Sequence, residues 1–218
     1  MKSFFNPDNW LMMFLGSLTD IMFLNAVCLL CCLPIVTIGP SLTALHYVTL
    51  KMAKGEEGYI IKDFFKSFKE NFRQSTIIWL IFLLVSAFFC LDLKIIKDGG
   101  MEVPYAVSVV IYVTYLFCCS TAMYAFPLTA RFTNKIKQTL RNAFLMSILH
   151  VVKTVIMAVI YLLPIVLIPL NYNFLAIFIL IGLAGPAYIN GYFWKGIFKK
   201  YEPEEEISDS LEETGEII

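Results

Sequence analysis

The chain has 218 residues, of which 59% are hydrophobic and 16% charged, with a formal net charge of zero and a mean hydropathy of +0.74. Soluble domains are about 45–50% apolar and about 25% charged, so this composition excludes an ordinary soluble domain. Several apolar stretches are too long for one buried core, and we therefore predict an integral membrane protein. The basic residues lie in short loops between these stretches, which argues against nucleic-acid binding.

Five apolar stretches are long enough to cross a bilayer, which takes about 20 residues of helix. They predict membrane spans at residues 11–36, 75–96, 104–126, 144–169 and 173–194. The predicted fold is an all-α polytopic bundle of five transmembrane helices, which forms a single domain over residues 1–201. Residues 202–218 carry eight acidic residues and no basic one, and they predict an acidic cytoplasmic tail.

Lysine and arginine are unevenly divided between the two sets of loops. Thirteen lie in the loop 37–74, in the loop 127–143 and after the last span. On the other side lie Lys2, Lys94 and Lys97. Loops rich in Lys and Arg stay in the cytoplasm, so we expect the N-terminus outside and the C-terminus in the cytoplasm. Base-rich and base-poor loops alternate along the chain, and termini on opposite sides of the membrane fit an odd number of spans.

The segment IIKDFFKSFKENF, residues 60–72, separates apolar from basic side chains at helical spacing. This pattern favours a cytoplasmic amphipathic helix that lies in the membrane interface, with its bases near anionic headgroups. The alternative is a helix whose apolar face packs on other parts of the protein. The candidate interfacial residues are Phe64, Phe65, Phe68, Lys62, Lys66 and Lys69.

Proline recurs near the cytoplasmic ends of the first, third and fifth predicted spans. The three stretches read LPIVTIGPSLTAL, FPLTARF and AGPAYINGYFW. A span followed by a proline break and a basic segment is consistent with an internal repeat, as found in transporters. The alternative is that proline is simply frequent in and near transmembrane helices.

Three polar residues inside the predicted spans form a candidate intramembrane site: Asp20, Asn25 and Lys153. A carboxylate as deep as Asp20 is costly, so it is a functional candidate, although a hydrogen-bonded Asp that fixes helix packing is the alternative. Gly16 and Ser17 share a helix face with Asp20, which would let another helix approach closely. Asn25 favours an interhelical hydrogen bond, and Lys153 is near enough to the cytoplasmic end to reach the headgroups.

Nothing in the sequence predicts an enzyme. The chain has no H-E-x-x-H, G-x-S-x-G or P-loop motif, so we assign no catalytic residue. Its six cysteines all lie in apolar stretches, without a His or acid at ligand spacing. We interpret them as small apolar packing residues, and we predict no metal site and no cofactor.

The stretch LPIVTIGPSLTALHYVTLKMAKGEEGYIIKDFFKSFKENFRQ, followed by a span that bears Trp79, resembles the YesL-like family of bacterial membrane proteins of unknown function. The later FPLTARF and LRNAF fit the same pattern, so the resemblance covers nearly the whole chain except the tail. It implies a multi-pass plasma-membrane protein of a Gram-positive bacterium. Members of this family often occur beside genes for carbohydrate ABC importers and polysaccharide breakdown.

This resemblance leads us to expect an accessory or partner component of a carbohydrate (ABC-type) uptake system. Its expected partners are the lipid bilayer and an ABC importer permease or another membrane protein. The Asp20 carboxylate and the possible repeat favour an alternative, a small-solute transporter in its own right. A membrane scaffold or signalling adaptor that uses the acidic tail is a third interpretation.

Overall fold

The computed structural model of the chain describes residues 10–56, 58–97 and 104–201, and the predicted acidic tail lies outside these residues. Every regular element in the described part is a helix, as the all-α prediction requires. The elements are α1 (Trp10–Cys31), η1 (Ile35–Thr37), α2 (Ile38–Lys54), α3 (Ile60–Lys97), α4 (Tyr105–Arg131), α5 (Ile136–Leu149), α6 (Val151–Leu170), α7 (Asn173–Ile181) and α8 (Ala184–Phe198).

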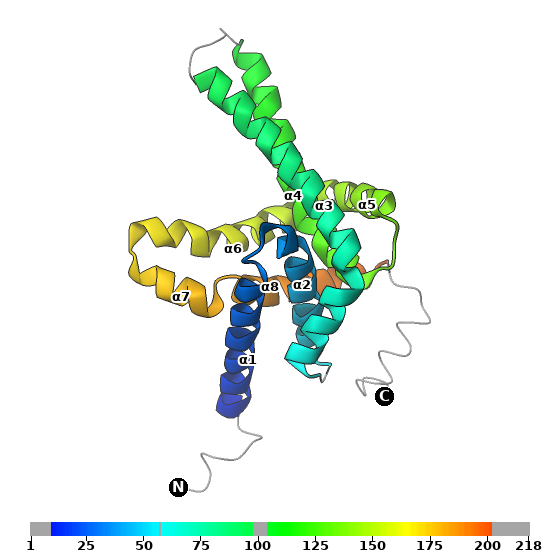
Figure 1. Ribbon diagram of the computed structural model, residues 1–218, viewed down its shortest axis with the longest axis vertical. Helices are drawn as coiled ribbons and strands as arrows, with labels where there is room; N and C mark the ends of the chain where they lie inside the picture. The colour runs from blue at the N-terminus through cyan, green and yellow to red at the C-terminus, as the bar shows by residue number, and fades with distance from the viewer. Residues whose placement is uncertain (1–9, 57, 98–103, 202–218) are drawn as a thin grey trace, which may run out of the picture.

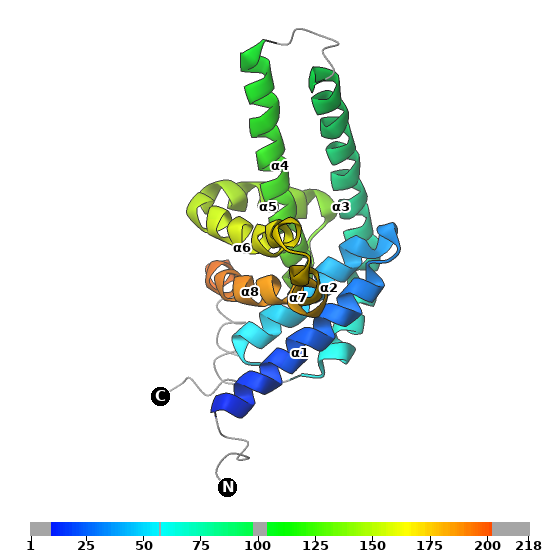
Figure 2. The same ribbon diagram turned by 90° about the vertical axis from the view of Figure 1, so that its left-hand side faces the viewer.

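The helix α2 lies at the centre of the molecule, between α3 and α8 and against α4 (Figure 2). Small residues allow the close approach on both sides. A Cβ on Gly39 would collide with the backbone of Ser75 in α3, and one on Gly191 of α8 would lie 3.0 Å from the Thr49 carbonyl oxygen. Helices in membranes pack closely where such small residues meet, so α2 is a buried core helix.

The helix α3 runs without a break from the predicted amphipathic segment into the second apolar stretch. One buried stripe follows it at helical spacing, through Phe64, Ser75, Ile78 and Phe82. Residues 60–97 contain no Gly or Pro that would end the helix. The predicted interfacial helix and the second predicted span are therefore two parts of one helix.

Two pairs of apolar helices extend from the centre in different directions. The upper halves of α3 and α4 form one arm, whereas α6 and α7 form a second arm that runs across the first (Figure 1). Both arms expose many large apolar side chains, such as Leu116 and Val152, which are 65% and 75% exposed. The apolar surface indicates a membrane protein, but the two directions do not confirm one bundle of five parallel spans.

Three helices are long and apolar enough to cross a membrane: Phe72–Ile95, Tyr105–Arg131 and Val151–Leu170. The pair α7 and α8 makes a fourth candidate if its two halves count as one span, although it bends by 50° at the break. In α1, Leu15–Cys31 is a shorter apolar helix. The described chain thus supports three or four candidate spans, and the predicted count of five is not confirmed.

Helix breaks lie inside the fourth and fifth predicted spans. The predicted span 144–169 begins inside α5, and His150 separates that helix from α6. α5 lies against the end of α4 and buries Ala143 and Met146 there. The predicted span 173–194 is likewise divided between α7 and α8. Hydropathy continues across both breaks, so composition alone did not reveal them.

The largest buried side chains gather where α4 and α8 meet. The rings of Tyr124 and Trp194 pack edge to face with their centroids 4.6 Å apart, and Trp194 stacks on Phe198. Ile78 of α3 and Met157 of α6 complete this cluster, and both are fully buried. Helices that diverge as two arms are thereby held on one shared core.

Candidate functional site

Three breaks between helices are bridged by polar side chains. Between α1 and α2, the Thr37 hydroxyl hydrogen-bonds to the carbonyl oxygen of Cys31 at 2.6 Å. The indole N–H of Trp79, from α3, donates to the carbonyl oxygen of Ile35 at 2.8 Å. Backbone groups released at a helix end need such partners, above all where lipid replaces water. The proline-containing break after the first apolar helix is therefore a stabilised feature.

The break between α5 and α6 is bridged in a similar way. The Thr154 hydroxyl lies 3.2 Å from the carbonyl oxygen of Ser147 and 3.0 Å from that of His150. It also lies 2.8 Å from the Tyr124 hydroxyl of α4. Because these groups are buried, their mutual hydrogen bonds hold α5 and α6 at a defined angle on α4.

A single amide, that of Asn25 in α1, bridges the break between α7 and α8. Its Nδ2 donates to the carbonyl oxygens of Phe178 and Ile179, at 3.3 and 2.7 Å. Its Oδ1 accepts from the backbone N–H groups of Leu183 and Ala184, at 2.8 and 2.9 Å. Asn25 is completely buried. It therefore satisfies both the last carbonyls of one half-helix and the first amides of the next, as the interhelical interpretation of Asn25 expects.

Next to this bridge lies a buried group of polar side chains from α2, α6 and α8. His46 and Tyr161 meet edge to face with ring centroids 6.1 Å apart. The Tyr161 hydroxyl lies by the side chains of Asn190 and Trp194. His46 Nδ1, the Tyr161 hydroxyl, Asn190 Oδ1 and Trp194 Nε1 are buried without a hydrogen bond of good geometry. Burying polar atoms without hydrogen bonds costs free energy. We call these four residues, His46, Tyr161, Asn190 and Trp194, the interior polar group.

Burial also decides the charge of His46, which is 7% exposed. Removing the imidazole from water disfavours its charged form and lowers the pKa of His46 to about 4. His46 is therefore neutral at pH 7, and it adds no charge to the interior polar group.

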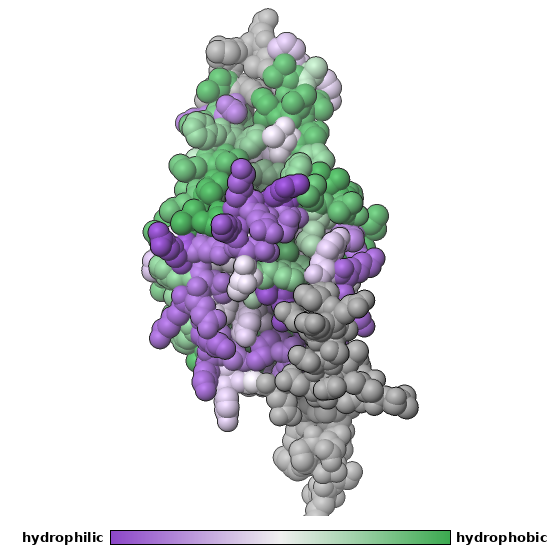
Figure 3. Space-filling view, turned by 90° about the vertical axis from the view of Figure 1, so that its right-hand side faces the viewer, coloured by the Kyte–Doolittle hydropathy of each residue, from purple (hydrophilic) through white to green (hydrophobic). Residues whose placement is uncertain are grey.

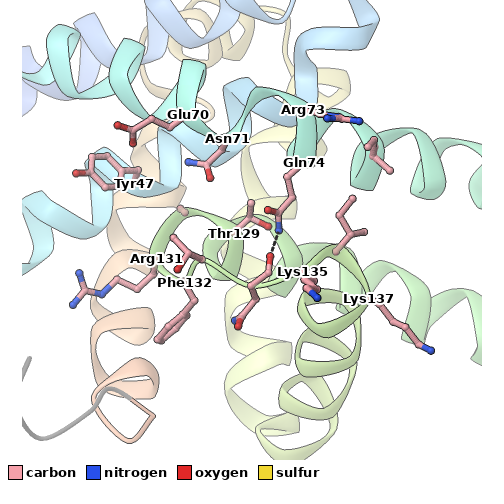
Figure 4. A pocket seen from close by; sticks show the side chains of 15 residues that line it. Tyr47, Glu70, Asn71, Arg73, Gln74, Thr129, Arg131, Phe132, Lys135 and Lys137 are labelled. Carbon is pink, nitrogen blue, oxygen red and sulfur yellow. Dashed lines mark hydrogen bonds between the residues drawn. The ribbon is translucent and has the colours of Figure 1, made fainter.

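A surface groove of about 960 Å³ lies between α3 and the α4–α5 connection (Figure 4). Along one side, α3 carries Glu70, Asn71 and Gln74 (Figure 4). The opposite side is formed by the end of α4, the connection and the start of α5, with Arg131 and Lys135 among its side chains. The Gln74 amide donates to the carbonyl oxygen of Asn134 at 2.9 Å, which ties the two sides together at the floor.

The groove is basic and lies at one end of two candidate spans. Four bases and one acid, Glu70, are among its lining residues, and the bases are Arg73, Arg131, Lys135 and Lys137. The candidate span of α3 begins at Phe72, and that of α4 ends at Arg131. In Figure 3, hydrophilic side chains gather below the hydrophobic upper part of the molecule. The groove therefore lies where a polar surface meets the apolar arm, a suitable place for an anionic ligand or a charged partner.

A smaller hollow of about 370 Å³ adjoins the groove. Phe132 and Asn134 line both of them, and Tyr201, the last described residue, lines the smaller one. The ring of Phe132 meets Phe198 of α8 edge to face, with the centroids 5.4 Å apart. The end of α8 is thus packed against the wall of the basic groove.

The structure does not bring Asp20, Asn25 and Lys153 together by hydrogen bonds or ion pairs. Asp20 is half-buried in α1 and forms no hydrogen bond or ion pair that involves another described residue. Lys153 lies in the first turn of α6, close to His150. The space around Gly16 is open, so no described helix of this chain makes the close approach that the sequence would allow there. The reason is that the buried residues of α1, among them Leu24 and Cys28, lie in its second half, whereas Gly16 lies in its first half.

The predicted interfacial residues of α3 point in different directions. Phe64 is fully buried in the protein, whereas Phe65 is 40% exposed. Phe68 is half-buried and packs beside Phe64. The three predicted lysines are exposed on the remaining surface: Lys62, Lys66 and Lys69. Packing on protein thus accounts for Phe64, and the exposed phenylalanines leave the interfacial interpretation as a prediction.

Sequence reasoning missed the groove as a unit and the interior polar group. Gln74 and Asn134 are 60 positions apart, and no local pattern links them. The proline-rich stretches were the one available signal for the helix breaks. Among the described residues, no three His, Cys, Asp or Glu side chains gather in a way that could hold a metal ion.

The fold and the groove define an all-helical membrane protein with a polar face at one end of its apolar helices. A family model described as "Protein of unknown function, DUF624" matches residues 10–93. The uncharacterized protein YesL of Bacillus subtilis (strain 168) is 28% identical over 120 residues, which are 55% of this chain and 56% of YesL. The match thus spans about half the length of that relative. These two matches confirm the resemblance to the YesL-like family, and no solved structure matches the chain.

Proposed function

We propose that this protein is an accessory subunit that binds another membrane protein through its basic groove. The observation that carries the proposal is the groove itself, a hollow of about 960 Å³ that adjoins the apolar arm. A partner that also sits in the membrane would meet both the exposed apolar side chains and the charged rim. The proposal includes no enzymatic step.

The resemblance to the YesL-like family extends this proposal to a carbohydrate (ABC-type) uptake system. The partner would then be a permease subunit with an acidic cytoplasmic surface. We also propose the bacterial plasma membrane as the location, with the groove on the cytoplasmic side. The distribution of Lys and Arg along the sequence supports this orientation, since the groove bases belong to the base-rich loops.

The test is purification of the tagged chain from its native host in a mild detergent, followed by identification of the proteins that co-purify. We expect a membrane-protein partner with the wild-type chain and a several-fold loss of it with the double variant Lys135→Glu and Lys137→Glu. The matched control is Lys62→Glu with Lys66→Glu, because these exposed lysines of α3 do not line the groove. Equal capture by both variants would refute the assignment of the groove.

A second candidate function is a small-solute transporter, and the broken helix α7–α8 favours it. Transporters build their binding sites from discontinuous helices near the middle of the membrane. The interior polar group around Asn190 lies in α8, directly after the break that Asn25 bridges. Purified chain in liposomes should then move a solute without any partner, and Asp20→Asn would abolish this movement if the carboxylate couples it to ions.

A further inference from the structure

The most acidic segment of the sequence follows directly on the end of the described chain. Residues 202–218 carry eight acidic side chains and no basic one, and the described part ends at Tyr201. Consecutive acids repel one another unless a basic surface neutralises them. The position of Tyr201 therefore decides which basic surface lies nearest to the start of the acidic segment.

Tyr201, the last described residue, lies beside the basic groove. It lines the smaller hollow together with Phe132 and Asn134, and these two residues also line the groove. The contact between Phe198 and Phe132 fixes the end of α8 at this wall. The first acidic residues are thus attached to a point that adjoins the groove.

The groove supplies bases that lack an acidic partner. Among the described residues, no carboxylate forms an ion pair with Arg73, Lys135 or Lys137. Glu70 is an acid on the same rim, but it leaves the lining with an excess of positive charge. Charges close to an apolar region are less well screened than in bulk water, so a complementary acidic segment would be attracted strongly.

We propose that the acidic residues 202–218 of this chain bind in its own basic groove and compete there with the partner. Seventeen residues extend to about 55 Å at about 3.3 Å per residue, which is ample to follow the groove from Tyr201. Because the segment is tethered, its effective concentration at the groove is on the order of millimolar, so even weak ion pairs suffice. The tail then acts as an internal competitor that an acidic partner has to displace.

The test is photo-cross-linking in the full-length chain. Thr133, an exposed residue of the groove, is replaced by p-benzoylphenylalanine, and the purified protein is irradiated and digested for mass spectrometry. We expect cross-links to peptides from residues 202–218 of the same molecule. Their yield should fall several-fold between about 0.01 M and about 1 M salt, since the Debye length shortens from about 30 Å to about 3 Å.

Two controls make the result specific. The same photoreactive residue at Tyr172, which is 83% exposed at the tip of the second arm, should give no cross-link to the tail. The double variant Lys135→Glu and Lys137→Glu should lower the Thr133 cross-link several-fold, whereas Lys62→Glu with Lys66→Glu should leave it unchanged. A mixture of isotopically light and heavy chains separates links within one molecule from links between two molecules.

The protein has to remain monodisperse for this test. The proposal is overturned if the Thr133 probe then links to phospholipid, to a second chain or to nothing. It is also overturned by a tail cross-link that the two groove charge reversals leave intact. The tail proposal and the proposed function can fail separately. If the tail cross-link is found but no partner co-purifies, the proposed function fails and the tail proposal stands.

Discussion

At the scale of single residues, buried polar side chains set the shape of this protein. Asn25 makes four hydrogen bonds to backbone groups of α7 and α8, and Thr154 lies within hydrogen-bond distance of three oxygens around the α5–α6 break. A buried backbone group that loses its partner costs about 1–3 kcal/mol, so each of these side chains has a large effect on stability. Substituting these buried polar side chains should therefore change the stability in ways that loss of apolar packing alone would not.

Replacing Asn25 by Leu should destabilise the α7–α8 segment. The Ile179 carbonyl and the N–H groups of Leu183 and Ala184 would lose their bond to Asn25, whereas the Phe178 carbonyl keeps the bond from the Gly182 N–H. We therefore expect the free energy of unfolding to fall on the order of 3 kcal/mol. Thermal unfolding of the purified protein in detergent measures this change. The control is Asn171→Ala, because Asn171 is exposed and bonds only to the nearby Asn173 amide through its side chain. Equal melting temperatures for the two variants would contradict the bridging role.

His46 predicts a stability that depends on pH. Its pKa is about 4 in the folded protein, because burial disfavours the charged form, and about 6.5 when the chain is unfolded. The unfolded chain therefore binds more protons between these values. The stability that neutral His46 contributes is complete above about pH 6.5 and declines as the pH falls toward 4, by on the order of 3 kcal/mol. Unfolding measured across this window should lose much of its pH dependence in His46→Gln.

At the scale of helices, α3 combines two roles that the sequence suggests are separate. Its first half packs on α2 through Phe64 and is tied to it by the ion pair of Lys51 with Asp63, at 3.0 Å. Its second half is part of the apolar arm. Because the helix is continuous, the arm and the wall of the groove that contains Gln74 belong to one helix.

The two neighbouring phenylalanines of α3 should respond differently to substitution. Phe64→Ser removes a fully buried ring and should lower the free energy of unfolding by about 3–5 kcal/mol. Phe65→Ser removes a ring that is 40% exposed, so we expect a loss of about 1 kcal/mol. Protease cleavage within residues 60–72 in inverted vesicles should accordingly rise more for Phe64→Ser. The opposite order would favour an α3 that lies in the interface and not on α2.

The close contact between α2 and α3 predicts a strong effect of Gly39→Ala. The added methyl group would collide with the Ser75 backbone, and overpacking of this kind costs about 1–3 kcal/mol. Gly16→Ala is the matched control, since the space around Gly16 is open and alanine favours helices. We expect the first variant to melt at a lower temperature and the second to melt at the same or a higher temperature. A Gly39→Ala protein as stable as the wild type would show that the two helices separate easily.

At the scale of the whole molecule, the described residues form two exposed apolar arms and one basic groove. The α3–α4 arm and the α6–α7 arm run in different directions from one core (Figures 1 and 2). The groove lies at the end of the first arm where its charged residues begin. This arrangement gives the molecule one polar face, and orientation in the membrane decides which compartment that face meets.

Labelling of single cysteines in an otherwise cysteine-free chain tests the proposed orientation. Asn171→Cys should react with an impermeant reagent in intact cells, because the α6–α7 connection would lie outside. Lys66→Cys and Lys135→Cys should react only in inverted vesicles, since both belong to base-rich segments. All three positions are exposed, so the lack of a reaction would not reflect burial. Reaction of Lys66→Cys in intact cells would show that the orientation is opposite to the proposed one.

The sequence by itself determined the class of protein, the all-helical fold and the helix break near the prolines of LPIVTIGPSLTAL, because length, hydropathy and proline positions are local properties of a chain. It also singled out Asn25 as an interhelical residue. Only the tertiary structure decided that Asn25 bridges α7 and α8, more than 150 positions away, and that Gln74 joins Asn134 under the groove. Such pairs depend on which helices pack together, and packing is set by shape complementarity across the whole chain. A continuous run of apolar residues is compatible with one span or with two half-helices, so the breaks appeared only where buried side chains supply the missing hydrogen bonds.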